Sequence, residues 1–171
     1  MNLRYPIGKF ECPETITPEH LSKWISDIEK LPSKISDLVS DFSRGQLETP
    51  YRDGGWTARQ VIHHIHDSHH HGYIRFKWAM TEEKPLIKAY NEQLWAELFD
   101  TKSAPVSLSL DLIKALHAKW VFFLKGLSPI DLKREFIHPE GNITISLAED
   151  IGIYAWHGNH HLAHLKIISE L

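Results

Sequence analysis

The sequence contains a single cysteine, Cys12, and this scarcity excludes several classes of site. One cysteine cannot form an internal disulfide bond, and it cannot supply the several thiolates of a cysteine-rich zinc site or an iron–sulfur cluster. Long apolar runs are missing too: no uncharged stretch reaches the roughly 18 apolar residues that a membrane-spanning helix needs. The first residues, MNLRYPIGKFECPE, hold no apolar run and no small-residue cleavage pattern, so we expect no signal peptide. These absences predict a cytoplasmic protein without a membrane segment.

An excess of charge of either sign is also absent. The formal net charge is −3, with 24% charged and 42% hydrophobic residues, which is ordinary for a soluble globular protein. This balance gives no reason to expect binding to nucleic acid or to an acidic membrane. A length of 171 residues fits one domain with a sizeable core, so we predict a single domain over residues 1–171.

Two long helices are predicted in the first half of the chain. Thr17 can cap the first helix, and Pro18 suits its first turn because the proline ring already has a helical φ. Pro32 lies further along the same apolar pattern and should bend this helix or divide it in two. The second helix is predicted to begin at Thr57 and to run to about Thr81.

Two more long helices are predicted in the second half. A connection over residues 83–107, with a short helix around Glu92–Leu98, leads to a third helix that stops near Gly126. The apolar residues of this third helix are Leu108, Leu112, Leu116, Trp120, Phe123 and Leu124. A loop or small hairpin with the β-prone run Asn142–Ser146 comes before the last helix, which starts near Leu147. Four helices of this length predict an all-α four-helix bundle.

Histidine is the residue type that the chain has in excess, with 13 in total. Ten of them fall in two short stretches: His63, His64, His66, His69, His70 and His71, then His157, His160, His161 and His164. Imidazole is the commonest protein ligand for several divalent metals and is neutral near physiological pH. Because both stretches are predicted to be helical, two helices far apart in sequence could build one metal site.

The histidines of the last helix lie on or beside its apolar face. Residues three or four apart share a face of a helix, and one such stripe holds Ile153, Tyr154, His157, His161, His164, Leu165 and Ile168. The i,i+4 spacing of His157 and His161 lets two imidazoles reach one ion, while His160 lies at the margin of the stripe. Histidines that only fill the core are the alternative, but each buried ring would need partners for its nitrogens. We therefore favour a metal site.

For the second helix, spacing does not show as clearly which histidines face inward, because they are spread around much of its circumference. Its main apolar stripe holds Ala58, Val61, Ile62, Ile65 and Phe76, with His69 on the same line. His63, His66 and His70 lie further round and are most simply solvent-facing. His64 is the best inward candidate and His71 is its rival, so spacing leaves the choice between these two open.

Two motifs suggest a family. Residues 54–68, GGWTARQVIHHIHDS, strongly resemble the DinB-like superfamily and within it the YfiT branch. The shared pattern is a Trp-Ser/Thr opening, a histidine eight residues after the tryptophan and an aspartate three residues further on. Residues 156–164, WHGNHHLAH, resemble the matching H-x-x-x-H motif. The resemblance covers nearly the whole chain.

The resemblance implies an up-down-down-up four-helix bundle that commonly forms a homodimer. It implies one divalent ion per chain, held by His64, His157 and His161. Members of the DinB-like superfamily have been described as metal-dependent hydrolases. The YfiT branch is also similar to bacillithiol S-transferases, which join a low-molecular-weight thiol to small electrophiles. The expected partner is therefore a small-molecule substrate, with hydrolysis and thiol transfer both open.

Three protein ligands leave a fourth position open, which is the pattern of a catalytic zinc site. We expect zinc, with nickel as the alternative, because imidazole accepts both ions. Asp67, one turn from His64, is the candidate general base, or a partner that orients a ligand imidazole. His164 could join the ion or hydrogen-bond to a ligand, and His160 is a further candidate for such a bond. The alternatives to an enzyme are a metal-storage protein, suggested by the extra histidines, and a structural dimer whose ion only joins two helices.

Overall fold

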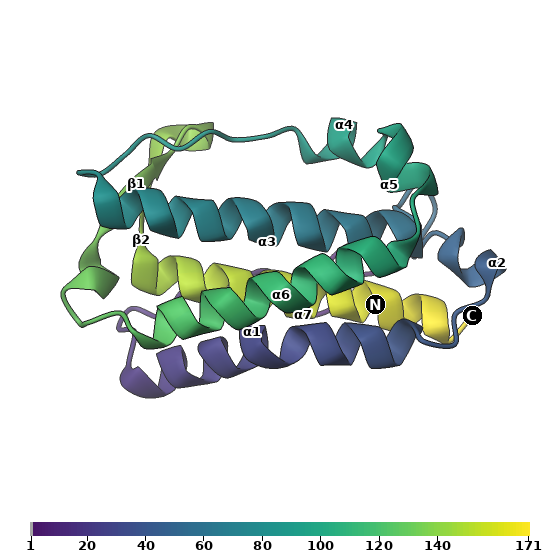
Figure 1. The fold of residues 1–171 in the computed structure, drawn as a ribbon, viewed down its shortest axis with the longest axis horizontal. Coiled ribbons are helices and arrows are strands. Elements are labelled where there is room, and N and C mark those ends of the chain that lie inside the picture. The colour runs from purple at the N-terminus through teal and green to yellow at the C-terminus, as the bar shows by residue number, and fades with distance from the viewer. Residues whose placement is uncertain (1) are drawn as a thin grey trace.

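The computed structural model describes residues 2–171, and its four long helices pack side by side along one axis (Figure 1). These helices are α1 (Pro18–Val39), α3 (Ala58–Thr81), α6 (Val106–Lys125) and α7 (Leu147–Ser169). In Figure 1, α1 and α7 run in one direction and α3 and α6 in the other. The predicted all-α, up-down-down-up bundle is confirmed.

Hydroxyl side chains begin three of the four long helices. Thr17, Thr57 and Ser146 are the N-cap residues of α1, α3 and α7, and each accepts a hydrogen bond from the backbone N–H three residues later. Such a cap satisfies one of the amide groups that the first turn leaves without a partner. The predicted starts of these helices are confirmed to within one residue.

Pro32 does not divide α1, which continues as one helix from Pro18 to Val39. A proline has no amide N–H, so it leaves the carbonyl of Ile28, four residues earlier, without its usual helical donor. Nδ1 of His117, on α6, lies 2.7 Å from this carbonyl oxygen and donates to it. A side chain from a neighbouring helix thus satisfies the backbone group that the proline leaves free.

A long crossover makes α3 and α6 parallel. The chain leaves α3 at one end of the bundle and returns along its length to the other end before α6 begins (Figure 1). The crossover contains α4 (Glu92–Ala96) and α5 (Phe99–Ser103), so the predicted short helix is present and a second one follows it. A further short helix, α2 (Arg44–Leu47), lies between α1 and α3.

The predicted hairpin is present before α7. Strands β1 (Glu135–His138) and β2 (Ile143–Ser146) pair antiparallel. The short 3-10 turn η1 (Asp131–Lys133) precedes β1, and a second one, η2 (Glu140–Asn142), connects the two strands. Gly141 has φ of +77°, a left-handed conformation that glycine adopts at little steric cost. The hairpin supports the start of α7, because the backbone N–H of Leu147 donates to the carbonyl of Arg134.

The buried face of α6 includes only some of the apolar residues of this helix. Leu108 and Leu112 are 56% and 51% exposed, whereas Ile113 and His117 are 1% exposed. The face that packs into the bundle consists of Ser109, Ile113, His117, Trp120, Val121 and Leu124. The sequence alone does not show which face of α6 is buried, because leucines lie on both sides of this helix and the apolar spacing fits either face.

Within residues 2–171 no helix combines the length and apolar character needed to cross a membrane.

Candidate metal centre

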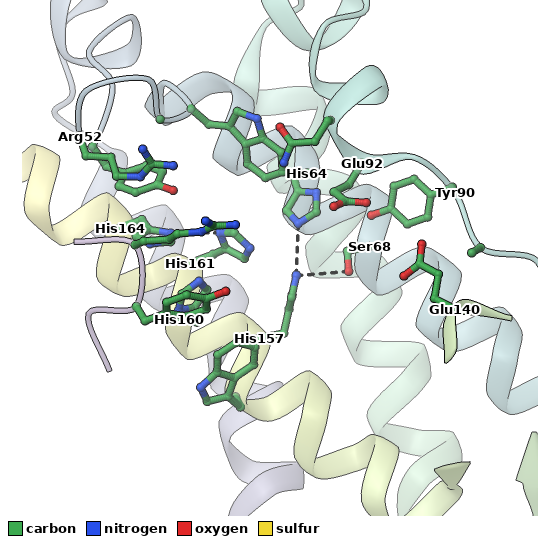
Figure 2. Close-up of a pocket in the computed structure, with 18 of the residues that line it drawn as sticks. Arg52, His64, Ser68, Tyr90, Glu92, Glu140, His157, His160, His161 and His164 are labelled. Carbon is green, nitrogen blue, oxygen red and sulfur yellow. Dashed lines mark hydrogen bonds between the residues drawn. The ribbon is translucent and has the colours of Figure 1, made fainter. Parts of the chain in front are cut away.

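A cavity of about 360 Å³ opens between α3, α7, the crossover and the N-terminal segment. This volume lies within the range of small-molecule sites. Histidines from α3 and α7 lie on one side of it, and Tyr90 of the crossover and Glu140 of the hairpin lie on the other (Figure 2). Parts of the chain that are far apart in sequence therefore enclose one space.

His64, His157 and His161 converge at this cavity. Nε2 of His64 lies 3.2 Å from Nε2 of His157, and the two rings point toward each other (Figure 2). One nitrogen from each of the three rings lies within 4.8 Å of the others. Two imidazole nitrogens bound to one tetrahedral zinc ion would lie about 3.3 Å apart, given Zn–N bonds of about 2.05 Å. The positions of the three side chains thus fit one divalent ion.

These three imidazoles are held in the neutral form that a metal ligand needs. Burial lowers the pKa of His64 from 6.5 to about 4. Burial also lowers the pKa of His157 and His161 well below the usual value, and the neighbouring histidines add to the effect. Protonated imidazoles would repel one another in this cluster. Each ring therefore stays neutral near neutral pH and keeps a lone pair that can bind a metal ion.

The two further histidines of α7 lie directly beside His161. Nδ1 of His164 lies 3.3 Å from Nδ1 of His161, and the ring of His160 stacks on Trp156. His160, His161 and His164 form a second group whose ring nitrogens lie within 4.8 Å of one another. Nδ1 of His160 and Nε2 of His164 are buried, and neither has a hydrogen-bond partner within residues 2–171. His164 is thus placed to orient His161 through a hydrogen bond.

Tryptophan and polar side chains complete the cavity wall. Trp56 lies against His64, with ring centroids 4.6 Å apart, and Trp156 lines the cavity from α7. The hydroxyl of Ser68 lies 3.4 Å from Nε2 of His157 (Figure 2). Charged residues of both signs line the cavity as well: Arg4, Arg52, Arg75, Glu92 and Glu140. The Nε atoms of Arg52 and Arg75 are buried and have no hydrogen-bond partner within the described residues.

Asp67 and His71 do not line the cavity. The carboxylate of Asp67 lies 3.3 Å from Nδ1 of His66. Nδ1 of His71 donates to the backbone carbonyl of Asp67, and its ring stacks on Tyr90. The structure therefore gives no support to Asp67 as a base at this cavity, and between the two rivals on α3 it brings His64, not His71, to His157.

His63 is buried, so the expectation that it faces solvent is wrong. Its Nδ1 lies 2.7 Å from the hydroxyl of Ser109 on α6, and its Nε2 lies 3.3 Å from the carbonyl of Ala104. His63 therefore joins α3 to the start of α6. His70 is exposed, as expected.

Sequence reasoning missed His117 and gave His69 no role. His69 is fully buried and hydrogen-bonds to both His157 and His117. The signal for His69 was present, because it lies on the apolar line of α3. For His117 the signal was the spacing of Ile113, His117 and Trp120, which becomes visible once the buried face of α6 is known.

Asp150, in the first turn of α7, is buried. It is 1% exposed, and its Oδ2 has no hydrogen-bond partner within residues 2–171. Burial raises the pKa of Asp150 from 3.8 to about 7, and Arg75 partly opposes this effect. A buried carboxylate without a close partner is expected to destabilise the fold.

Comparison with known proteins places these features in a family. The model of the DinB superfamily matches residues 27–165. A protein of Bacillus mycoides is 53% identical over 169 residues, covering 99% of this chain and 96% of that protein. One of Oceanobacillus iheyensis is 53% identical over 170 residues, covering 99% and 98%. Both carry the name "Putative metal-dependent hydrolase".

The solved structure of YfiT from Bacillus subtilis superposes closely on this chain. The TM-score is 0.96 at 46% sequence identity, with 99% of this chain and 97% of YfiT covered. YfiT is described as "a probable metal-dependent hydrolase with an unusual four-helix bundle topology".

Proposed function

This chain belongs to the DinB superfamily, and from that premise we propose that it is an enzyme dependent on one divalent metal ion. His64, His157 and His161 hold the ion, and the reaction is hydrolysis of a small molecule. The observation that carries the proposal is the convergence of three neutral imidazoles, those of His64 and His161 buried and that of His157 half-buried, at the wall of an open cavity. A site that only stabilised the fold would be expected to have four protein ligands and no cavity.

A bound divalent ion supplies Lewis acidity, which polarises a carbonyl group or makes a bound water or thiol more acidic. Zinc is the proposed ion and nickel the alternative, because a set of three imidazoles suits both. The protein's own contribution is to keep these imidazoles unprotonated through burial and to shield one side of the site with Trp56. Ser68 offers a hydroxyl to substrate atoms near His157.

Transfer of a low-molecular-weight thiol is the second candidate reaction. The observation that favours it is the pair of guanidinium groups of Arg52 and Arg75, whose buried Nε atoms have no partner within the described residues. Both arginines line the cavity, together with Glu92 and Glu140. Such a wall could bind a small thiol that carries charged groups and hold its sulfur near the three histidines. Hydrolysis of a small molecule does not by itself require charged side chains in the cavity wall.

Metal content per chain is the first test of the proposal. Untagged wild-type protein, His64→Ala and His70→Ala are loaded with zinc or nickel, and bound metal is measured after removal of excess. We expect one ion per chain in the wild type and in His70→Ala, and loss of the ion in His64→Ala. More than one ion per chain would favour storage, because His160, His161 and His164 form a second group.

Activity assays then separate the two reactions. The zinc-loaded protein is incubated with a panel of small amides and esters, and separately with cysteine or another small thiol and an electrophile. Hydrolysis in the first panel, lost in His64→Ala, supports the hydrolase. Conjugation in the second panel, weakened by Arg52→Gln or Arg75→Gln, supports thiol transfer. Absence of both activities in a protein that binds one ion would contradict the enzyme proposal.

A further inference from the structure

A row of three hydrogen bonds crosses all four long helices of the bundle. Nδ1 of His157 lies 3.1 Å from Nε2 of His69, and Nδ1 of His69 lies 2.9 Å from Nε2 of His117. Nδ1 of His117 lies 2.7 Å from the carbonyl oxygen of Ile28. We call His157, His69 and His117 the histidine network. It begins at the cavity on α7, passes through α3 and α6, and ends on the backbone of α1.

The last bond fixes the direction of the whole row. A carbonyl oxygen can only accept a hydrogen bond, so Nδ1 of His117 carries the proton. A neutral imidazole has one N–H, so Nε2 of His117 must accept from Nδ1 of His69. Nε2 of His69 must in turn accept from Nδ1 of His157. The remaining nitrogen of His157, Nε2, then keeps its lone pair.

The requirement for neutral rings is met by the surroundings. His69 is fully buried and His117 is 1% exposed. Burial lowers the pKa of His117 from 6.5 to about 4. Trp120 and Tyr154 pack edge-on against His69 and keep water from its ring. Each ring therefore carries a single proton near neutral pH.

Pro32 leaves free the carbonyl of Ile28, which is the acceptor at the end of the row. In an uninterrupted helix the carbonyl of Ile28 would accept from the amide of residue 32, but proline has no amide proton. The freed carbonyl lies beside His117 and accepts from it. A proline inside a helix, which normally destabilises it, here leaves a strong acceptor in the core of the bundle.

We infer that His69 and His117 are positioning residues that hold the proton of His157 on Nδ1 and so direct the lone pair of its Nε2 into the cavity. Nε2 of His157 is the atom that lies 3.2 Å from Nε2 of His64. Partners of this kind fix the tautomer and the orientation of a ligand imidazole. The inference rests on the proposed function only in taking His157 as a metal ligand.

The direct test is the tautomer of each ring in the metal-free protein. Long-range ¹H–¹⁵N correlation spectra of the imidazoles distinguish a proton on Nδ1 from one on Nε2. We expect His157, His69 and His117 all to carry the proton on Nδ1. A proton on Nε2 of any of the three would overturn the inference. This measurement needs neither bound metal nor activity, so it stands even if the proposed function fails.

Zinc affinity provides the second test, measured by competition with a chelator for wild type, His117→Met, His117→Gln and His70→Gln. Methionine replaces the nitrogen that accepts from His69 with a thioether sulfur, which is only a weak acceptor, and we expect affinity to fall about 10- to 100-fold. Glutamine can place an amide oxygen where Nε2 of His117 was, so His117→Gln should bind zinc nearly as tightly as the wild type. The exposed control, His70→Gln, should bind as the wild type does.

The pair of substitutions separates positioning from packing. Wild-type affinity in His117→Met, or an equal loss in both His117 variants, would overturn the inference, because the acceptor would then not matter. Circular dichroism verifies that each variant is folded. If His117→Met does not fold, the inference is judged from the imidazole tautomers of the wild type and of His117→Gln. A wild-type protein that binds neither zinc nor nickel would refute the proposed function alone.

Discussion

Pro32 and His117 act on the same backbone group: the proline deprives the carbonyl of Ile28 of its helical donor, and His117 donates to it at 2.7 Å. This contact connects the backbone of α1 to the cavity through two buried histidines. The candidate metal centre is therefore supported by the core of the bundle as well as by the helices that carry its proposed ligands. The predictions below test these links separately.

Removal of His161 should abolish tight metal binding, whereas removal of the charge of Asp67 should not. His161→Ala takes away one of three converging imidazoles. Asp67 pairs with His66 outside the cavity, so Asp67→Asn should change the free energy of zinc binding by less than about 1 kcal/mol, or roughly fivefold in affinity. Chelator competition measures both variants. A loss of metal in Asp67→Asn comparable to that in His161→Ala would place the aspartate at the site.

The metal-free protein should lose stability as the pH falls below about 6.5. His117 has its pKa lowered from 6.5 to about 4 in the folded state, so the unfolded state takes up a proton first. Its contribution to stability is present above pH 6.5 and is lost toward pH 4, by up to about 3 kcal/mol for this residue alone. Urea denaturation at a series of pH values measures the decline. His117→Gln, which cannot titrate, should show a shallower decline, and an identical one would contradict this account.

Asp150→Asn should stabilise the protein near pH 8. The pKa of Asp150 is raised from 3.8 to about 7 by burial, so this group's contribution to stability is present below pH 3.8 and is lost as the pH rises toward 7. This pKa shift corresponds to a loss of at most about 4 kcal/mol in the free energy of unfolding. Asparagine removes the charge while keeping the shape of the side chain. Thermal denaturation at pH 5 and pH 8 tests this. Glu149→Gln is the matched control and should have little effect, and a destabilised Asp150→Asn would mean that the carboxylate is needed.

Gly72→Ala should destabilise the bundle by about 1–3 kcal/mol, the usual cost of overpacking a core. A Cβ atom at Gly72 would lie only 2.4 Å from Cζ of Tyr154 and 2.8 Å from Cη2 of Trp120. Both rings are buried and also pack against His69, so they have little room to move. Gly45→Ala is the control, because its Cβ would meet only Oγ of Ser43 at 3.7 Å. Equal denaturation midpoints for the two variants would contradict the prediction.

Local signals in the sequence were sufficient to predict the helices and to propose one half of the candidate metal centre. Capping residues such as Thr17 and Thr57 satisfy backbone amides within a few residues of themselves, so their effect is readable without the fold. The i,i+4 spacing of His157 and His161 is likewise a property of a single helix. The paired motifs added the family, and with it the arrangement of the bundle.

The tertiary structure decided which faces meet. Leu108 and Leu112 of α6 lie outside and His117 lies inside because the rotation of α6 depends on its contacts with α1 and α3. The same packing buries His63, keeps Asp67 out of the cavity wall, and carries the histidine network to the carbonyl that Pro32 frees. Sequence determines what a helix can present on each face. Which face is buried, and which nitrogen finds a partner, depends on the neighbouring helices, because burial and hydrogen bonding are properties of contacts between them.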